Sequence, residues 1–408
     1  MSLEQQTTTS QTTAKVSSLA RRIHGWSWQA FPIGMGTGAV YVTLSGVKSR
    51  SNLLLQVEHV FFFLNIVLFL LNTTTLTLQL FFFPRQSLRL IKDPVKGVFV
   101  PLAVLSFATI LIGTINYAVL PGHISPNLIY HLFWVYVSLS LIVCFPMLMI
   151  WFNKPHDLAT FTPAWAFLIF PLMLVGVIAF NVLRVIPPEE PRAIGILLVG
   201  YAFQGLGFFM TFFYICIYII RIMMTGFLEG HQANGAFVAV GPPGFTALAL
   251  LKLGDCARKT LPLHGLVTPT AGDVWYAVSV MSAVMLFGLA VFLFLFGILP
   301  YWFKLHKHLS EILGCWALTF PNVGFISVIR VLADIFDLPG FIVWHSIMVV
   351  FICITWAVLF FLTLMAFWRG KIFFANPEDV LKDAPTSKLQ SLSMEADDEE
   401  KTLDGHSR

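Results

Sequence analysis

Two basic residues stand inside long apolar segments of this sequence, at matched positions. Arg330 follows Pro321 by nine residues, and Lys252 follows Pro243 by the same number. Charged side chains are costly inside a membrane, and they mark functional sites where they occur. If both face a common axis, they create a positive potential about 13 Å from the prolines, at about 1.5 Å per residue. Such a potential concentrates anions and excludes cations. The alternative is that both side chains extend to lipid headgroups.

Polar and aromatic residues lie beside the same prolines. Thr37, Thr246 and Asn322 can bind carboxylate oxygens next to the positive ends of half-helices, or they can satisfy backbone groups that the prolines free. Phe320 directly precedes Pro321, and a ring beside a helix break can close a narrow path. The sequence therefore predicts Phe320 as a pore gate. The predicted substrate-binding residues are Arg330, Lys252, Thr37, Thr246 and Asn322.

Catalytic and metal-binding patterns are missing from the sequence. The five cysteines have no paired metal-type spacing, and there is no His-Glu-x-x-His motif. We therefore expect no enzyme activity, no metal and no cofactor. His59, His131 and His345 lie near the outer ends of apolar segments, where they either make structural hydrogen bonds or take part in proton-coupled transport.

Composition identifies the class of protein that must position these residues. The chain has 408 residues, of which 57% are hydrophobic and 11% are charged, whereas soluble domains have about 25% charged residues. The formal net charge is only +4, and the basic residues are dispersed, so we expect no nucleic-acid partner. A spanning helix needs about 20 apolar residues. We predict ten such helices, at residues 27–46, 53–83, 96–118, 127–151, 161–183, 192–222, 231–253, 273–301, 308–336 and 340–367.

Every odd-numbered segment has an interior proline, and the spacing between successive prolines is about 70 residues. Proline breaks or kinks a helix, and broken membrane helices occur where the backbone faces protein or a cavity. The spacing indicates five helical hairpins of similar role. We therefore predict an all-α membrane protein with the odd helices as an inner pore ring and the even helices as an outer ring. The predicted helix breaks that line the pore are Pro32, Pro101, Pro171, Pro243 and Pro321.

The distribution of Lys and Arg sets the expected orientation. Basic residues are more numerous on the side that holds both chain ends, which predicts cytoplasmic termini in the plasma membrane. Polar, low-complexity ends predict disordered tails at residues 1–25 and 371–408, around a membrane domain at residues 26–370.

Four motifs resemble a known family. They are FPIGMGTG at 31–38, GYAFQGLG at 200–207, VGPPGF at 240–245 and LTFPNVGF at 318–325. Together they resemble the tellurite-resistance/dicarboxylate transporter family, within the voltage-dependent anion channel superfamily, and they are most similar to yeast-type malic acid permeases. The resemblance implies a homotrimer in which each protomer has its own five-helix pore. By motif match, it also implies that Phe320 occludes that pore.

The resemblance leads to three hypotheses about function. The first is plasma-membrane transport of malate and related C4-dicarboxylates, with or without coupling to protons. The second is a sulfite efflux pump, and the third is a gated anion channel. The lipid bilayer and a small organic anion are the expected partners.

Overall fold

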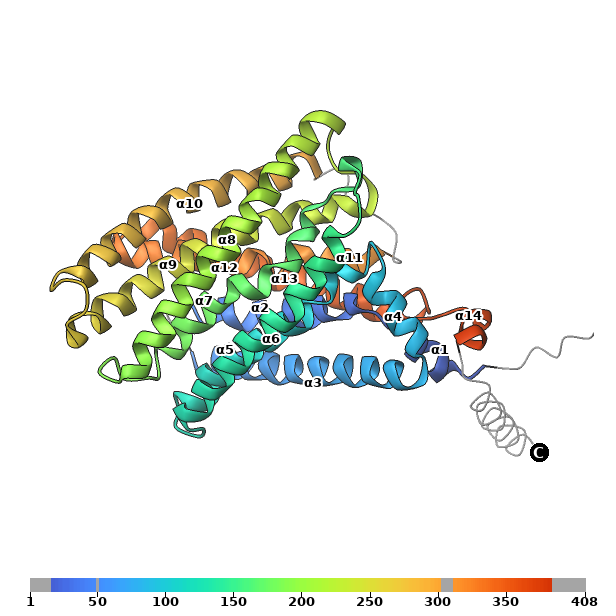
Figure 1. The fold of residues 1–408 in the computed structure, drawn as a ribbon, viewed down its shortest axis with the longest axis horizontal. Helices are drawn as coiled ribbons and strands as arrows, with labels where there is room; N and C mark the ends of the chain where they lie inside the picture. The colour runs from blue at the N-terminus through green and yellow to red at the C-terminus, as the bar shows by residue number, and fades with distance from the viewer. Residues whose placement is uncertain (1–15, 49–50, 302–310, 384–408) are drawn as a thin grey trace, which may run out of the picture.

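The computed structural model describes residues 16–48, 51–301 and 311–383, and these residues contain helices but no strand (Figure 1). Within the described residues, eight helical segments are long and apolar enough to cross a membrane. They are Asn52–Phe82, Gly97–Val119, Pro126–Phe152, Pro191–Thr225, Gln232–His264, Ala271–Leu299, Ile312–Ile335 and Pro339–Trp368. Two shorter apolar helices, α2 (Phe31–Leu44) and α7 (Phe170–Val182), fall within two further predicted segments. Residues 308–310 of the ninth predicted segment lie outside the described part of the chain.

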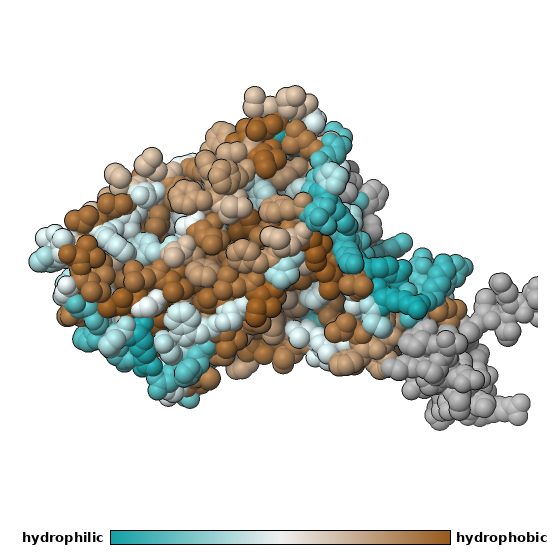
Figure 2. Space-filling model, viewed as in Figure 1, coloured by the Kyte–Doolittle hydropathy of each residue, from teal (hydrophilic) through white to brown (hydrophobic). Residues whose placement is uncertain are grey.

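Burial separates the helices into two groups. The outer group is α3 (Asn52–Phe82), α6 (Pro126–Phe152), α8 (Pro191–Thr225), α10 (Ala271–Tyr301) and α13 (Pro339–Trp368). In their most apolar stretches only 17% to 39% of the residues are buried. The inner group is α2, α5 (Leu102–Thr114), α7, α9 (Gly241–Thr260) and α12 (Asn322–Ile335). Figure 2 shows the apolar side chains that cover the middle of the molecule, with hydrophilic residues gathered at both ends, one of which holds α4 (Pro84–Lys92) and α14 (Pro377–Asp383).

Each inner α-helix begins beside one of the repeated prolines. Pro32 and Pro171 lie in the first turns of α2 and α7, Pro243 lies in the first turn of α9, and Pro101 and Pro321 are the N-caps of α5 and α12. Proline is tolerated there because the first N–H groups of a helix have no intrahelical partner. Short 3-10 segments lie ahead of these helices, at η1 (Trp28–Ala30), η2 (Gly97–Phe99), η5 (Pro163–Leu168), η6 (Gly230–Val240) and η9 (Trp316–Leu318).

The five inner helices contact one another in a closed cycle. α2 packs on α5, α5 on α7, α7 on α9, α9 on α12, and α12 on α2. Glycines permit the closest of these crossings, because a Cβ atom at Gly244 would lie 2.7 Å from the backbone N of Phe325, and one at Gly324 would lie 2.5 Å from that of Phe245. The starts of α9 and α12 are therefore in backbone contact.

Polar side chains of the outer helices satisfy carbonyl groups at the breaks. Asn72 of α3 donates to the carbonyl oxygen of Ala30 at 3.1 Å, and the Tyr136 hydroxyl of α6 donates to that of Pro171 at 2.9 Å. A buried carbonyl without a partner is costly, so these bonds stabilise the breaks at fixed positions.

The terminal segments differ from the expectation of disorder beyond residues 26–370. Helix α1 (Ser18–Gly25) packs against α3 and α14, and the Arg21 side chain donates to the carbonyl oxygen of Ala375 at 2.9 Å. Composition missed this because the contacts join segments that are far apart in the sequence. The remaining tail residues, 1–15 and 384–408, lie outside the described chain.

Candidate functional site

A cavity of about 650 Å³, which we call the outer cavity, opens between the inner helices, on the side of the prolines away from the chain termini. All five inner helices contribute to its wall, for example through Met35, Leu105, Leu174, Leu248 and Val323. On α12 the residues in the wall are Val323, Ser327, Arg330, Val331 and Asp334, with Phe320 just before the helix. These recur every three or four residues, so one face of the helix lines the cavity.

A second cavity, of about 350 Å³, which we call the inner cavity, lies on the other side of the breaks. Its wall comes mainly from the segments that precede the inner helices, including Phe99 of η2, Phe167 of η5 and Ala317 of η9. Pro32 also lines it, and the other four predicted prolines are not among the described residues lining either cavity.

Phe320 belongs to the walls of both cavities, and no other described residue does. Its side chain is 5% exposed, and its ring lies 5.6 Å from that of Phe167. Phe167 in turn contacts Phe99 and Phe170, with ring centroids 5.4 Å and 5.5 Å away. An aromatic cluster of Phe99, Phe167, Phe170 and Phe320 therefore separates the two cavities, and we call it the neck.

Arg330 lies in the wall of the outer cavity but is not free. Its Nε donates to the carbonyl oxygen of Gly46 at 2.9 Å, near the C-terminal end of α2, and its Nη1 donates to Asp334 at 2.6 Å. A cation is favourable at a helix C-terminus, so Arg330 ties α12 to α2. Its neighbour Asp334 offsets part of its charge.

Lys252 and Arg184 line the same cavity. Lys252 is exposed although α9 is otherwise largely buried, and its side chain makes no hydrogen bond or ion pair with another residue in the described ranges. Arg184 donates to the side-chain oxygens of Asn116 at 2.8 Å and Asn181 at 3.1 Å. The predicted pair of Arg330 and Lys252 thus shares one cavity with three more cations, and two carboxylates also line it. These residues are Lys48, Arg184 and Lys259, and Asp255 and Asp334.

Three predicted binding residues face other partners. The Thr37 hydroxyl donates to the carbonyl oxygen of Ile33 and accepts from Trp356 Nε1 at 3.0 Å. Thr246 accepts a 2.8 Å hydrogen bond from Gln204. The Asn322 amide donates to the carbonyl oxygen of Leu318 at 2.9 Å.

All three side chains are buried, and they are not among the described residues that line the two cavities. The structure therefore does not bring these three residues together with Arg330 and Lys252, and their binding of substrate stays a prediction. Their polar groups satisfy the backbone at the breaks or hold the outer helices α8 and α13.

Several polar residues of the outer cavity were missed from the sequence. Thr109, Asn116, Asn181 and Ser327 all line it. His345, for which the sequence left a structural role and a role in proton coupling open, lines it as well. The helical spacing from Phe320 to Arg330 is a signal that could have identified Ser327. No comparable spacing in the sequence identifies Asn116 or Asn181, because their role depends on contacts with the neighbouring helix. Among the described residues, no group of three His, Cys, Asp or Glu could hold a metal ion.

Known proteins are similar to this chain over most of its length. The family described as voltage-dependent anion channel matches residues 25–364. The malic acid transport protein of Schizosaccharomyces pombe is 27% identical over 365 residues, covering 88% of this chain and 83% of the relative. A putative malic acid transport protein of the same organism is 26% identical, covering 88% and 84%. The sulfite efflux pump of Trichophyton rubrum is 24% identical over 360 residues, covering 86% and 92%.

These matches confirm the resemblance that the four motifs indicated. The family match includes all five inner helices and both cavities described above. Relatives of this chain are named as a malic acid transport protein and a sulfite efflux pump, in agreement with the apolar helices and the cation-lined cavity. This chain is a multi-pass membrane protein that belongs to the voltage-dependent anion channel family.

Proposed function

We propose that this protein transports malate and related C4-dicarboxylates across the plasma membrane. The observation that supports transport most directly is the pair of cavities on either side of Phe320, one of them lined by Arg184, Lys252 and Arg330. The assignment of malate as the substrate rests on the two relatives named as malic acid transport proteins, which are 27% and 26% identical.

The arrangement that we propose is a ten-helix protomer built from five hairpins. The closed cycle of α2, α5, α7, α9 and α12 forms the pore ring, and α3, α6, α8, α10 and α13 form the outer ring. We further propose that the protein is a homotrimer with one pore in each protomer and with both termini in the cytoplasm. The excess of Lys and Arg on the side of the termini supports this orientation.

In this proposal, the outer cavity attracts the dianion through its cations. The anion then meets the neck, where the inner α-helices begin, and their positive dipole ends lower the cost of a negative charge in an apolar passage. Phe320 acts as the gate. Its ring moves aside to join the outer cavity to the inner one, so its position sets the rate of passage.

Two alternatives have specific support. A sulfite efflux function is supported by relatives that carry that name, at 24% identity. A gated anion channel is supported by the description of the matching family.

Several assays in one host separate these functions. The protein is produced in a yeast host that lacks malate and sulfite transporters, and uptake of labelled malate is measured with succinate, malonate or sulfite as competitors. Malate transport predicts saturable uptake that succinate or malonate reduces. Sulfite tolerance without malate uptake favours the efflux pump, and large chloride or nitrate currents in patch-clamped membranes favour the channel. Repeating the uptake with the pH gradient collapsed tests proton coupling.

A further inference from the structure

A third cavity, of about 500 Å³, lies at the end of the molecule where the two terminal segments meet. Its wall is predominantly polar. One side comes from the chain ahead of α2, with His24, Ser27 and Gln29, and another comes from the segment after α13, residues 371–376. Helix α4 and its following loop contribute Gln86, Arg89 and Lys96.

This third cavity shares wall residues with the inner cavity. Gln29 and Leu313 line both. Because the inner cavity ends at Phe320, the three cavities follow one another from the outer side of the molecule to the terminal side. The third cavity, which we call the antechamber, is therefore the mouth of the path on the side of the termini.

The charge of the antechamber is positive. Arg89, Lys96 and Lys371 line it, against one carboxylate, Asp379. The side chains of Lys96 and Lys371 make no hydrogen bond or ion pair with other residues of the described chain. Their charge is therefore available to a solute, whereas Arg89 is paired with Asp383.

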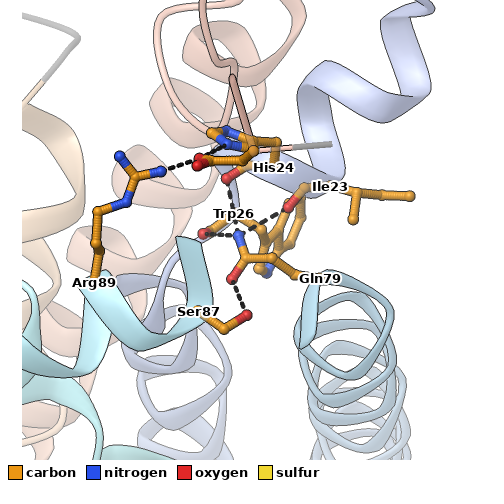
Figure 3. A network of polar contacts seen from close by, with 7 residues as sticks. Ile23, His24, Trp26, Gln79, Ser87 and Arg89 are labelled. Atoms are coloured by element: carbon orange, nitrogen blue, oxygen red, sulfur yellow. Dashed lines mark hydrogen bonds and ion pairs between the residues drawn. The ribbon is translucent and has the colours of Figure 1, made fainter. Parts of the chain in front are cut away.

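A buried polar network holds the terminal segments in place around the antechamber (Figure 3). The Gln79 amide of α3 donates to the carbonyl oxygens of Ile23, His24 and Trp26, each at 2.9 Å. His24 Nε2 lies 2.8 Å from Asp383 of α14. The walls that carry the basic residues are thus fixed to the membrane helices, as a preformed binding site requires.

We propose that the antechamber is a second binding site for the transported dicarboxylate, in which Lys96 and Lys371 neutralise the two carboxylates before the anion reaches the neck. This proposal rests on the proposed transport function. It adds that the protein has its own anion site on the side of the termini, separate from Arg330 and Lys252.

The first test compares transport from the two faces. The variant Lys96→Gln/Lys371→Gln is compared with Arg85→Gln/Lys92→Gln, which removes two charges at the same end from exposed α4 positions that line none of the three cavities. The malate concentration that gives half-maximal transport is measured in inside-out vesicles for the inner face and in intact cells for the outer face. We expect the antechamber variant to raise this concentration at the inner face about fivefold, as about 1 kcal/mol of lost attraction would. The half-saturating concentration at the outer face and the maximal rate should be unchanged.

A second test needs no transport. Gln29→Cys, in a background without the five native cysteines, is modified with an anionic and with a cationic methanethiosulfonate reagent. The rate with the anionic reagent divided by the rate with the cationic reagent reports the local potential. The variant Lys96→Gln/Lys371→Gln should lower this ratio severalfold. Equal changes in the α4 control, or an unchanged ratio, would overturn the proposal by assigning the potential to general surface charge. If the wild-type protein carries no malate, this ratio still tests the positive potential of the antechamber. Failure of the proposed transport function and failure of the proposed antechamber site are therefore distinguishable.

Discussion

Replacing Phe320 with alanine should open the neck. The phenyl ring is the group that both cavities share, so its removal joins the outer cavity of about 650 Å³ to the inner one of about 350 Å³. Burying a phenylalanine side chain contributes about 2 kcal/mol. If the ring must leave its buried site for the path to open, that cost keeps the closed form favoured by about thirtyfold. Phe320→Ala should therefore raise the basal anion flux by about thirtyfold.

The matched control is Phe325→Ala on the same helix. Phe325 is fully buried, its ring packs against Phe287 and Phe294 at 5.6 Å and 5.1 Å, and it lines neither cavity. Its removal leaves a closed void, so we expect a stability loss of about 3 to 5 kcal/mol without a rise in flux. At Phe320 water from the cavities can occupy the space, so the loss should be nearer about 2 kcal/mol.

The assay is efflux of labelled malate from proteoliposomes without a gradient of pH or potential, normalised to the amount of folded protein. Phe320→Leu should give an intermediate flux because it shortens the obstruction. The gating role is wrong if Phe320→Ala folds, reaches the membrane and shows the flux of the wild type. It is also wrong if Phe325→Ala raises the flux equally, because general loosening would then explain both.

Three further perturbations have defined outcomes. Lys252→Gln should raise half-saturating malate at the outer face about fivefold, from about 1 kcal/mol of lost attraction, without lowering the melting temperature; a change in stability alone would refute its role in binding. Thr37→Val should lower stability by about 1 kcal/mol, since Trp356 loses its acceptor, and a large rise in half-saturating malate would restore Thr37 as a binding residue. Burial, and then the charge of Arg89, hold the pKa of His24 below its ordinary value of 6.5, so folding favours the neutral ring. The stability that His24 contributes should be complete above about pH 6.5 and fall as the pH drops through the folded pKa; a melting temperature that falls equally in His24→Gln would assign the effect to other groups.

The apolar helices and the helix breaks were readable from the sequence for a physical reason. A membrane helix needs a long apolar run, and proline changes the backbone wherever it stands. The spacing of Pro32, Pro101, Pro171, Pro243 and Pro321 therefore located the points at which five buried α-helices begin. Both signals are local, so they need no knowledge of neighbouring helices.

The direction in which each side chain faces was decided only by the tertiary structure. Helices such as α2 and α7 are apolar on all sides, so periodicity does not specify their rotation about the axis. Thr37 consequently bonds to Trp356 of α13 and does not line the cavity.

The amino-acid sequence alone established which residues lie at the helix breaks and which basic residues follow the prolines at a constant spacing. The packing of five helices in a cycle decided that Phe320 and Arg330 line the same cavity and that Arg330 also binds the carbonyl oxygen of Gly46. It also joined the two terminal segments beside the antechamber, where Gln79, His24 and Asp383 meet. Contacts between residues so distant in the chain form only in the folded protein, so they cannot be predicted from composition.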